Sequence, residues 1–270
     1  MPSLESGLYR LGWLDQFARE DTSIHRVDPR AKLATTAVFL VCVVSLGRYD
    51  LLALVPFVLF PVVLASASGI PARELAVRLA AVAPFAVMVG AFNPFFDTAV
   101  VGHLGPVAIT GGSLSWLSII ARSLLTTSAA LILIATTGMT SVCAGLERLG
   151  LPDVLSTQLL LLYRYLFVLT DEVLHLSQAR SLRSFGRKGM GPGAYANMVG
   201  HLLVRTANRA QRIYDAMRCR GFQGRVRMAS ALRMRRSDWA FLLGWSAAFL
   251  AFRAVNVPLL IGGLITGVAR

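Results

Sequence analysis

Long apolar runs dominate this chain and restrict the environment in which it can fold. Four runs follow one another between Asp28 and Met139, and a fifth extends from Trp239 to Gly267. Runs of this length suit helices that cross a bilayer. Hydrophobic residues make up 55% of the chain and charged residues only 15%, whereas a soluble domain carries about a quarter charged residues. We therefore predict an all-α, polytopic membrane protein with about five transmembrane helices.

The charged residues are distributed unevenly between the two sides of this predicted membrane domain. Sixteen of the 27 Lys and Arg residues fall between Met139 and Ser237, and the loop at 93–112 has none. Basic loops stay in the cytoplasm. We therefore expect 139–237 and the N-terminus inside the cell, and the 93–112 loop and the C-terminus outside. The net charge of +13 is explained by this aqueous face and does not indicate a nucleic-acid partner.

The basic region is predicted to contain two long helices that end alike. Each carries a narrow apolar seam, at 155–176 and at 199–217, with residues spaced by threes and fours. A shift of 37 residues superimposes their ends, Ala179-Arg-Ser-Leu-Arg183-Ser-Phe185 over Ala216-Met-Arg-Cys-Arg220-Gly-Phe222. Helix capping alone could explain Arg220-Gly221. We judge that capping requires neither an Arg on the seam nor the following Phe, so the repeat favours a functional role.

These helix ends resemble the paired small-Arg-Gly signatures of the transmembrane T component of energy-coupling factor (ECF) transporters. The residues before Arg220, Arg-Ala-Gln-Arg-Ile-Tyr-Asp-Ala-Met, are most similar to the cobalt branch, usually called CbiQ. Val27-Asp-Pro-Arg-Ala-Lys-Leu33 looks like the start of that family's first membrane helix. The first copy departs from the pattern, because it reads Leu182-Arg183-Ser184 where a small residue and Gly are usual.

The resemblance implies a non-catalytic subunit of an ATP-driven importer in the prokaryotic cytoplasmic membrane. Its long helices would couple ABC-type ATPase subunits to a substrate-binding membrane S component, with cobalt as the favoured substrate and nickel or a vitamin as alternatives. ATP and Mg would be bound by the ATPase, and cobalt by the S component. The implied ATPase-coupling residues are Ala179, Arg180, Arg183, Ser184, Ala216, Cys219, Arg220, Gly221 and Phe222. The implied helix-start motif consists of Asp28, Pro29, Arg30 and Lys32.

The residues themselves leave a second class open, an integral-membrane enzyme whose basic helices bind anionic lipid. The sequence contains no GxxxxGK[ST] and no HExxH motif, and its four histidines are dispersed. We therefore predict no catalytic residues and no metal site in this chain. Arg122, inside the fourth apolar run, either reaches the interface or has a functional partner.

We predict that the chain has four regions. Residues 1–27 form an interfacial N-terminal segment, and 28–138 contain transmembrane helices 1–4. Residues 139–237 form a cytoplasmic coupling-helix domain. Residues 238–270 contain transmembrane helix 5 and the C-terminus.

Overall fold

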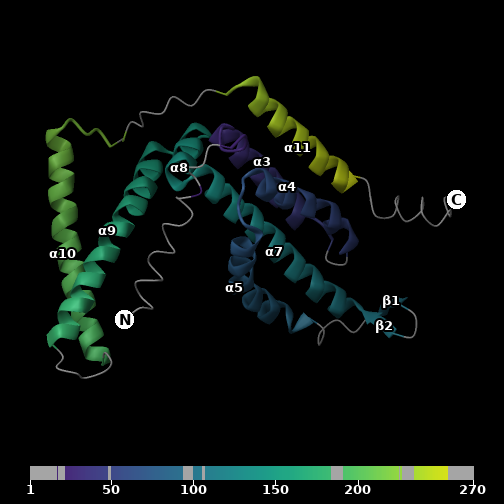
Figure 1. Ribbon diagram of the computed structural model, residues 1–270, viewed down its shortest axis with the longest axis horizontal. Helices are drawn as coiled ribbons and strands as arrows, with labels where there is room; N and C mark the ends of the chain where they lie inside the picture. Colours follow the sequence, from purple (N-terminus) through teal and green to yellow (C-terminus); the bar gives the residue numbers. More distant parts are fainter. Residues whose placement is uncertain are drawn as a thin grey trace. The chain divides into compact units, whose positions relative to one another are not determined.

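The structure is a computed structural model of the chain. It describes residues 17, 22–47, 50–93, 100–104, 107–183, 191–224, 226 and 234–254, with the backbone alone between 100 and 110. Helices make up most of it (Figure 1). In chain order the elements are α3 (Pro29–Val44), the 3₁₀ helix η1 (Leu52–Val58), α4 (Leu59–Ala67), α5 (Ala72–Gly90), β1 (Val100–Leu104), β2 (Val107–Thr110), α7 (Gly111–Thr137), α8 (Met139–Arg148), α9 (Asp153–Arg183), α10 (Pro192–Cys219) and α11 (Arg236–Ala254).

These elements belong to two compact units. The long-helix unit contains α8, α9 and α10, and the core unit contains α3 to α7 together with α11. The chain passes from the core unit into the long-helix unit between Gly138 and Met139.

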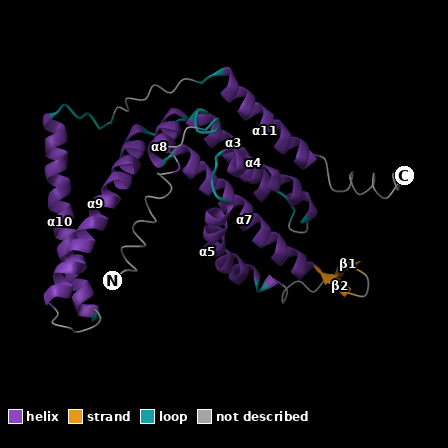
Figure 2. Ribbon diagram, in the orientation of Figure 1, coloured by secondary structure: helices purple, strands orange, loops and turns teal. Residues whose placement is uncertain are grey.

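The helical class is confirmed, with one correction in the segment at 93–112. We expected a loop there, but β1 and β2 form an antiparallel pair with Gly102 opposite Ile109 (Figure 2). Both strand sequences are rich in β-branched residues, such as Val100 and Ile109, which favour extended backbone. The many glycines of this segment concealed that preference in the sequence.

The second apolar run contains two prolines, a pattern that predicts one kinked helix. The run instead begins as the 3₁₀ helix η1, with Pro56 inside it, and continues as α4, with Pro61 in the first turn. Proline has no backbone N–H and cannot donate the bond to the fourth residue before it. The interrupted bonding is consistent with the tighter 3₁₀ turns of η1.

An aromatic cluster forms the centre of the core unit. Phe39 of α3, Phe60 of α4 and Phe249 of α11 are fully or almost fully buried, and their ring centroids lie 4.8 to 5.3 Å apart. Phe57 of η1 stacks on Phe249 at 6.1 Å. Edge-to-face and offset contacts of this kind add roughly 0.5–1.5 kcal/mol per pair to the burial of the rings. The cluster therefore joins the first, second and last apolar segments.

Two further contacts position α7 within the core unit. A Cβ atom on Gly90 of α5 would lie 2.5 Å from Cδ1 of Trp116, so the two helices approach closely only because that residue is Gly. The guanidinium of Arg122 donates to the carbonyl of Gly47, in the connection between α3 and η1, and Asp50 is its electrostatic partner. Arg122 thus has partners inside the chain.

Among the described residues, one helix is both long and apolar enough to cross a bilayer, and that helix is α7. The apolar stretch formed by η1 and α4 is shorter, at residues 52–67. The predicted interfacial segment lies outside the described residues except for Phe17 and 22–27, and so does the part of the fifth predicted span after Ala254.

The apolar seams of the long helices predict packing of helix against helix, either with the two long helices crossing each other or with both lying on the inner ends of the membrane helices. Leu162 of α9 is 64% exposed, Leu203 of α10 is 68% exposed, and α10 has no buried residue. These seam residues are therefore not buried within the long-helix unit, and packing of the seams on the inner ends of the membrane helices stays a prediction. The seams thus expose apolar side chains on this unit, and exposed apolar patches are typical of surfaces that bind partners.

Candidate functional site

Gly221 determines how α10 ends. Gly221 adopts φ +80°, the left-handed conformation that L side chains rarely adopt. The N–H of Gly221 donates to the carbonyl of Arg218, and the N–H of Phe222 donates to the carbonyl of Met217, both at 3.0 Å. These two bonds define a Schellman motif, which satisfies helix-end carbonyls.

This motif corrects our interpretation of the repeat. A Schellman motif is often accompanied by an apolar contact between the residue after the glycine and the last turn of the helix. Met217 and Phe222 line the same hollow. Capping therefore explains Phe222 as well as Gly221, contrary to our expectation. Arg220 is the residue that capping leaves unexplained, because its side chain makes no contact that the motif needs.

Arg220 is exposed at this tip, beside a hollow formed with the start of α9. The hollow measures about 810 Å³ and is lined by Asp153, Met217, Arg220, Gly221, Phe222, Gln223 and Val226. The backbone N–H of Val226 donates to the hydroxyl of Thr157 at 3.3 Å, so the chain after α10 reaches back to α9. None of the described residues accepts a hydrogen bond from the Arg220 guanidinium. The tip thus presents five unused N–H donors next to an open hollow.

The end of α9 presents the other copy of the pattern. Arg183 is the last residue of the helix and is exposed, as is Ala179, whereas Arg180 is partly buried. Leu182, which replaces the usual small residue, is 82% exposed. Ser184 lies outside the described residues, and its predicted role stays a prediction. An exposed Leu beside an exposed Arg suits a contact that combines an apolar group with a charged one.

The two tips lie at opposite ends of an antiparallel pair of helices (Figure 1). The guanidinium of Arg205 in α10 contacts the carboxylate of Glu172 in α9 at 2.7 Å. With 31 and 28 residues, the helices are about 46 and 42 Å long at 1.5 Å per residue. Arg183 and Arg220 are therefore too far apart to serve one small ligand, but they could engage two separate partners.

Asp28 and Pro29 start a helix, as the sequence predicts. Asp28 caps α3 by accepting a hydrogen bond from the N–H of Arg30 at 2.9 Å, and Pro29 occupies the first turn. Arg30 Nε lies 3.9 Å from an Asp28 carboxylate oxygen. Lys32 is 4% exposed, and its Nζ donates to the carbonyl of Thr136 at 2.9 Å. The helix-start motif is therefore part of the core unit's interior.

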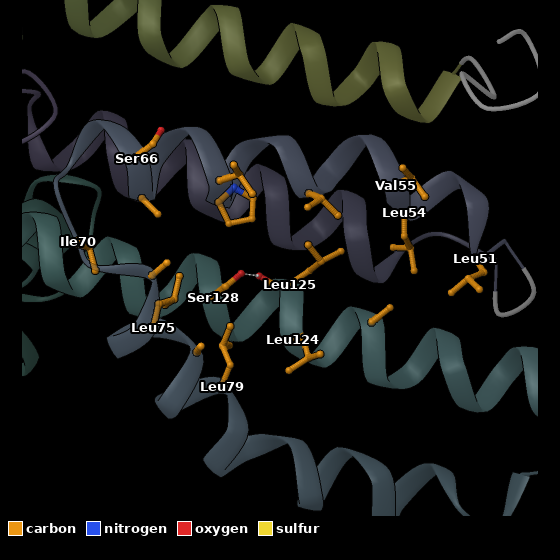
Figure 3. A pocket seen from close by; sticks show the side chains of 17 residues that line it. Leu51, Leu54, Val55, Ser66, Ile70, Leu75, Leu79, Leu124, Leu125 and Ser128 are labelled. Atoms are coloured by element: carbon orange, nitrogen blue, oxygen red, sulfur yellow. Dashed lines mark hydrogen bonds between the residues drawn. The ribbon is translucent and has the colours of Figure 1, made fainter.

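An open apolar pocket of about 650 Å³ is lined by η1, α4, α5 and α7 of the core unit (Figure 3). Leu54, Leu75, Leu79 and Leu124 are among the side chains around it. The hydroxyls in its lining belong to Ser66 and Ser128, and both donate to carbonyls of their own helices. This lining offers an apolar group a place but supplies no ligand for a metal ion.

No group of three or more His, Cys, Asp or Glu residues is placed to hold a metal ion in the part of the chain that the structure describes. Among the cysteines, Cys42 and Cys143 are buried and Cys219 is exposed at the tip of α10.

Comparison with known proteins identifies the family of this chain. The model of the CbiQ cobalt transport protein family matches residues 20–230. The chain belongs to the CbiQ family. This family is the T-component family of ECF transporters, so the protein is a membrane component of a cobalt transport system rather than an enzyme. CbiQ proteins work in transporter complexes with ATPase and substrate-binding components. An uncharacterized protein of Methanocaldococcus jannaschii is 26% identical over 241 residues, covering 86% of this CbiQ chain and 82% of that protein.

Sequence reasoning missed Asp238. Its two carboxylate oxygens accept hydrogen bonds from the N–H groups of Asp28, at 3.3 Å, and Arg235, at 2.7 Å. An acidic residue in the first turn of α11 is a recognisable helix-start signal. Its contact with the helix-start motif spans 210 residues, and nothing in the local sequence indicates that contact.

Proposed function

We propose that this CbiQ protein is the coupling subunit of an ECF importer, transmitting ATP-driven motion to a cobalt-binding membrane partner. The observation that carries the proposal is the pair of exposed arginine tips at the two ends of α9 and α10. A guanidinium is a strong multivalent donor to acceptors on a partner protein. Two separated tips suit two ATPase subunits, and rigid helices can convert movement of those subunits into movement of the membrane part.

The exposed seams support the proposed contact with the substrate-binding membrane partner. Apolar side chains that remain exposed on a helix favour burial against a partner, and the substrate-binding component is the partner that such a seam would hold. Nickel and a vitamin remain the alternatives to cobalt. ATP and Mg belong to the ATPase subunits in this proposal, and the transported ion binds the substrate-binding component and not this chain.

The proposed topology has five spans, with the N-terminus and residues 139–237 inside the cell and the C-terminus outside. The surface of the core unit supports a lipid environment, because Val41, Phe85 and Met88 are 68 to 71% exposed. Large apolar side chains with this exposure are costly in water and favourable in lipid. Cysteine labelling in intact cells tests the orientation. We expect reagent from outside to reach the 93–112 loop, whereas labelling of Gly189→Cys would overturn the orientation.

The coupling role is tested by Arg220→Glu. If the guanidinium is buried against an ATPase acceptor, charge reversal should cost about 2–5 kcal/mol of binding, which is roughly a 30- to 4,000-fold loss of affinity. Arg212→Glu, the same charge change about two turns earlier on α10, is the matched control. We expect Arg220→Glu to abolish ATPase co-purification and cobalt uptake, Arg183→Glu to weaken both, and the control to retain both. Normal uptake in the Arg183→Glu, Arg220→Glu double variant would refute the coupling role.

Metal binding by the isolated subunit provides a separate test. Equilibrium dialysis with cobalt, after removal of any purification tag, should show no stoichiometric binding. Stoichiometric binding that is lost on mutation of His103 would place the ion path in this chain.

A further inference from the structure

A buried lysine lies at the end of α7, next to the point where the chain leaves the core unit. Lys32 of α3 is 4% exposed, and its ammonium donates to the carbonyl of Thr136 at 2.9 Å and to that of His25 at 3.5 Å. Burying an ammonium costs several kcal/mol unless opposite charges and hydrogen bonds compensate. A lysine retained in such a place therefore needs an explanation beyond space filling.

Two buried carboxylates offset part of this cost as nearby opposite charges, without forming an ion pair with Lys32. Asp28 is 6% exposed and Asp238 is 2% exposed, and both act on Lys32 as opposite charges. Asp238 also accepts the backbone N–H of Asp28, which joins the first turn of α11 to the start of α3. With Arg30 beside Asp28, the cluster contains two cations and two anions. We call Asp28, Lys32, Asp238 and the Thr136 carbonyl the clasp.

The position of the Thr136 carbonyl indicates what the clasp does. The last carbonyls of a helix lack partners within that helix, and a cation at this end is favourable. Thr136 is in the last turn of α7, Gly138 follows with φ +72°, and α8 begins at Met139. A single left-handed residue therefore forms the whole connection between the helix of the core unit and the first helix of the long-helix unit. We call Gly138 the joint.

We propose that Lys32 is a positioning residue of the coupling reaction. Through its bond to the Thr136 carbonyl, and with Asp28 and Asp238 nearby as opposite charges, it fixes the last turn of α7 and so sets the direction in which the chain enters the joint. Through the joint, movement of the long-helix unit passes to the membrane helices. This inference rests on the proposed coupling function for its role, but the geometry that it requires can be measured without transport.

A purely stabilising role would not favour this chemistry. Replacing a buried ion cluster by apolar side chains of similar volume is often neutral or stabilising. The ammonium adds a directed bond to one carbonyl beside the joint, which an apolar side chain cannot form. Phe60 of the aromatic core lines the same small hollow as Lys32 and Thr136, but it does not share this bond. Loss of the bond should therefore loosen the joint more than it loosens the aromatic core.

The direct test measures the joint in the full-length subunit. Spin labels at Leu117→Cys of α7 and Leu149→Cys after α8 lie on opposite sides of Gly138, and both positions are about half exposed. They are introduced with the natural cysteines replaced by serine. We expect Lys32→Met, which keeps the length but removes the charge, to broaden the distance distribution at least two-fold. Lys32→Arg, which keeps the charge, and Arg73→Ala, which removes an exposed charge from α5, should retain the parental width.

Transport provides the second readout, in the complex with its ATPase and substrate-binding partners. We expect the Lys32→Met complex to assemble and hydrolyse ATP, but to import at least ten-fold less cobalt per ATP than the parent. If Lys32→Met does not accumulate, the isosteric Asp238→Asn is measured in the same two ways. An unchanged distance distribution would refute the positioning role of Lys32. So would a loss of cobalt uptake that is fully explained by a smaller amount of assembled complex. The two proposals can also fail separately. If the parent complex imports no cobalt but Lys32→Met still broadens the distance distribution, the proposed function is refuted, whereas the positioning of the joint by Lys32 is supported.

Discussion

The cap of α10 allows two roles of Gly221 to be separated by substitution. A glycine at a docking tip can be required because a partner approaches closely, or because the backbone is left-handed. Gly221 has φ +80°, and a Cβ atom built on it meets no atom within 4 Å. In the free subunit the requirement is therefore conformational and not steric.

The free-energy cost of replacing Gly221 follows from its left-handed conformation and its open surroundings. A left-handed conformation costs an L residue about 1–2 kcal/mol, and replacing Gly by Ala returns about 0.4–1 kcal/mol by restricting the unfolded chain. Gly221→Ala should therefore destabilise the last turn by about 1 kcal/mol. Since 1.4 kcal/mol is a factor of ten, opening of that turn should increase about five-fold. Gly221→Asn should cost roughly half as much, because Asn tolerates this conformation better.

Hydrogen exchange of the Phe222 amide, which donates to Met217 at 3.0 Å, measures this opening. Gly200→Ala is the matched control, since Gly200 lies inside the same helix, is exposed and also has no neighbour within 4 Å. The control should gain about 1 kcal/mol from helix propensity. Equal exchange in the Ala and Asn variants would refute the conformational argument. If both variants exchange as expected but lose ATPase binding alike, close approach by the partner is the additional requirement.

Three further outcomes are expected. Phe249→Ala should destabilise the core unit by about 3–5 kcal/mol, seen as a lower thermal unfolding midpoint in detergent, and a cost below 1 kcal/mol would contradict the aromatic core. N-ethylmaleimide should modify Cys219 and spare Cys143, because burial raises the pKa of the Cys143 thiol and leaves less thiolate; bound ATPase should slow the Cys219 reaction about ten-fold, and equal rates would place the tip outside the contact. Leu203→Asp should leave the subunit folded, since Leu203 is exposed, but weaken binding of the substrate-binding component, and intact binding would show that the seam has another use.

Local signals in the sequence predicted the parts of the fold that depend on neighbouring residues. Asp28 and Pro29 predicted the start of α3 correctly because capping involves residues two positions apart. The apolar runs predicted the helices for the same reason. The β hairpin was missed because its glycines outweighed short β-branched stretches, and η1 was missed because two prolines changed the helix type without ending the helix.

The site was only partly predictable. The repeat drew attention to Arg220, but the Schellman motif shows that Gly221 and Phe222 have structural reasons to be there. The contact between Asp28 and Asp238 depends on the packing of the first and last described helices, which no local pattern encodes. The partner of the seams was not predictable for a different reason. Apolar spacing shows that a face favours burial, but it does not show whether the same chain or another protein covers it.

The exposed seams have a consequence for the cell that makes this subunit. If the long-helix unit lies in the cytoplasm as proposed, a copy without partners displays Leu162 and Leu203 of the seams to water. Such surface promotes aggregation and recognition by chaperones and proteases. The lifetime of the subunit would then depend on the supply of its partners. Excess copies would be removed without a dedicated regulator, and the stoichiometry of the transporter would be maintained by protein turnover.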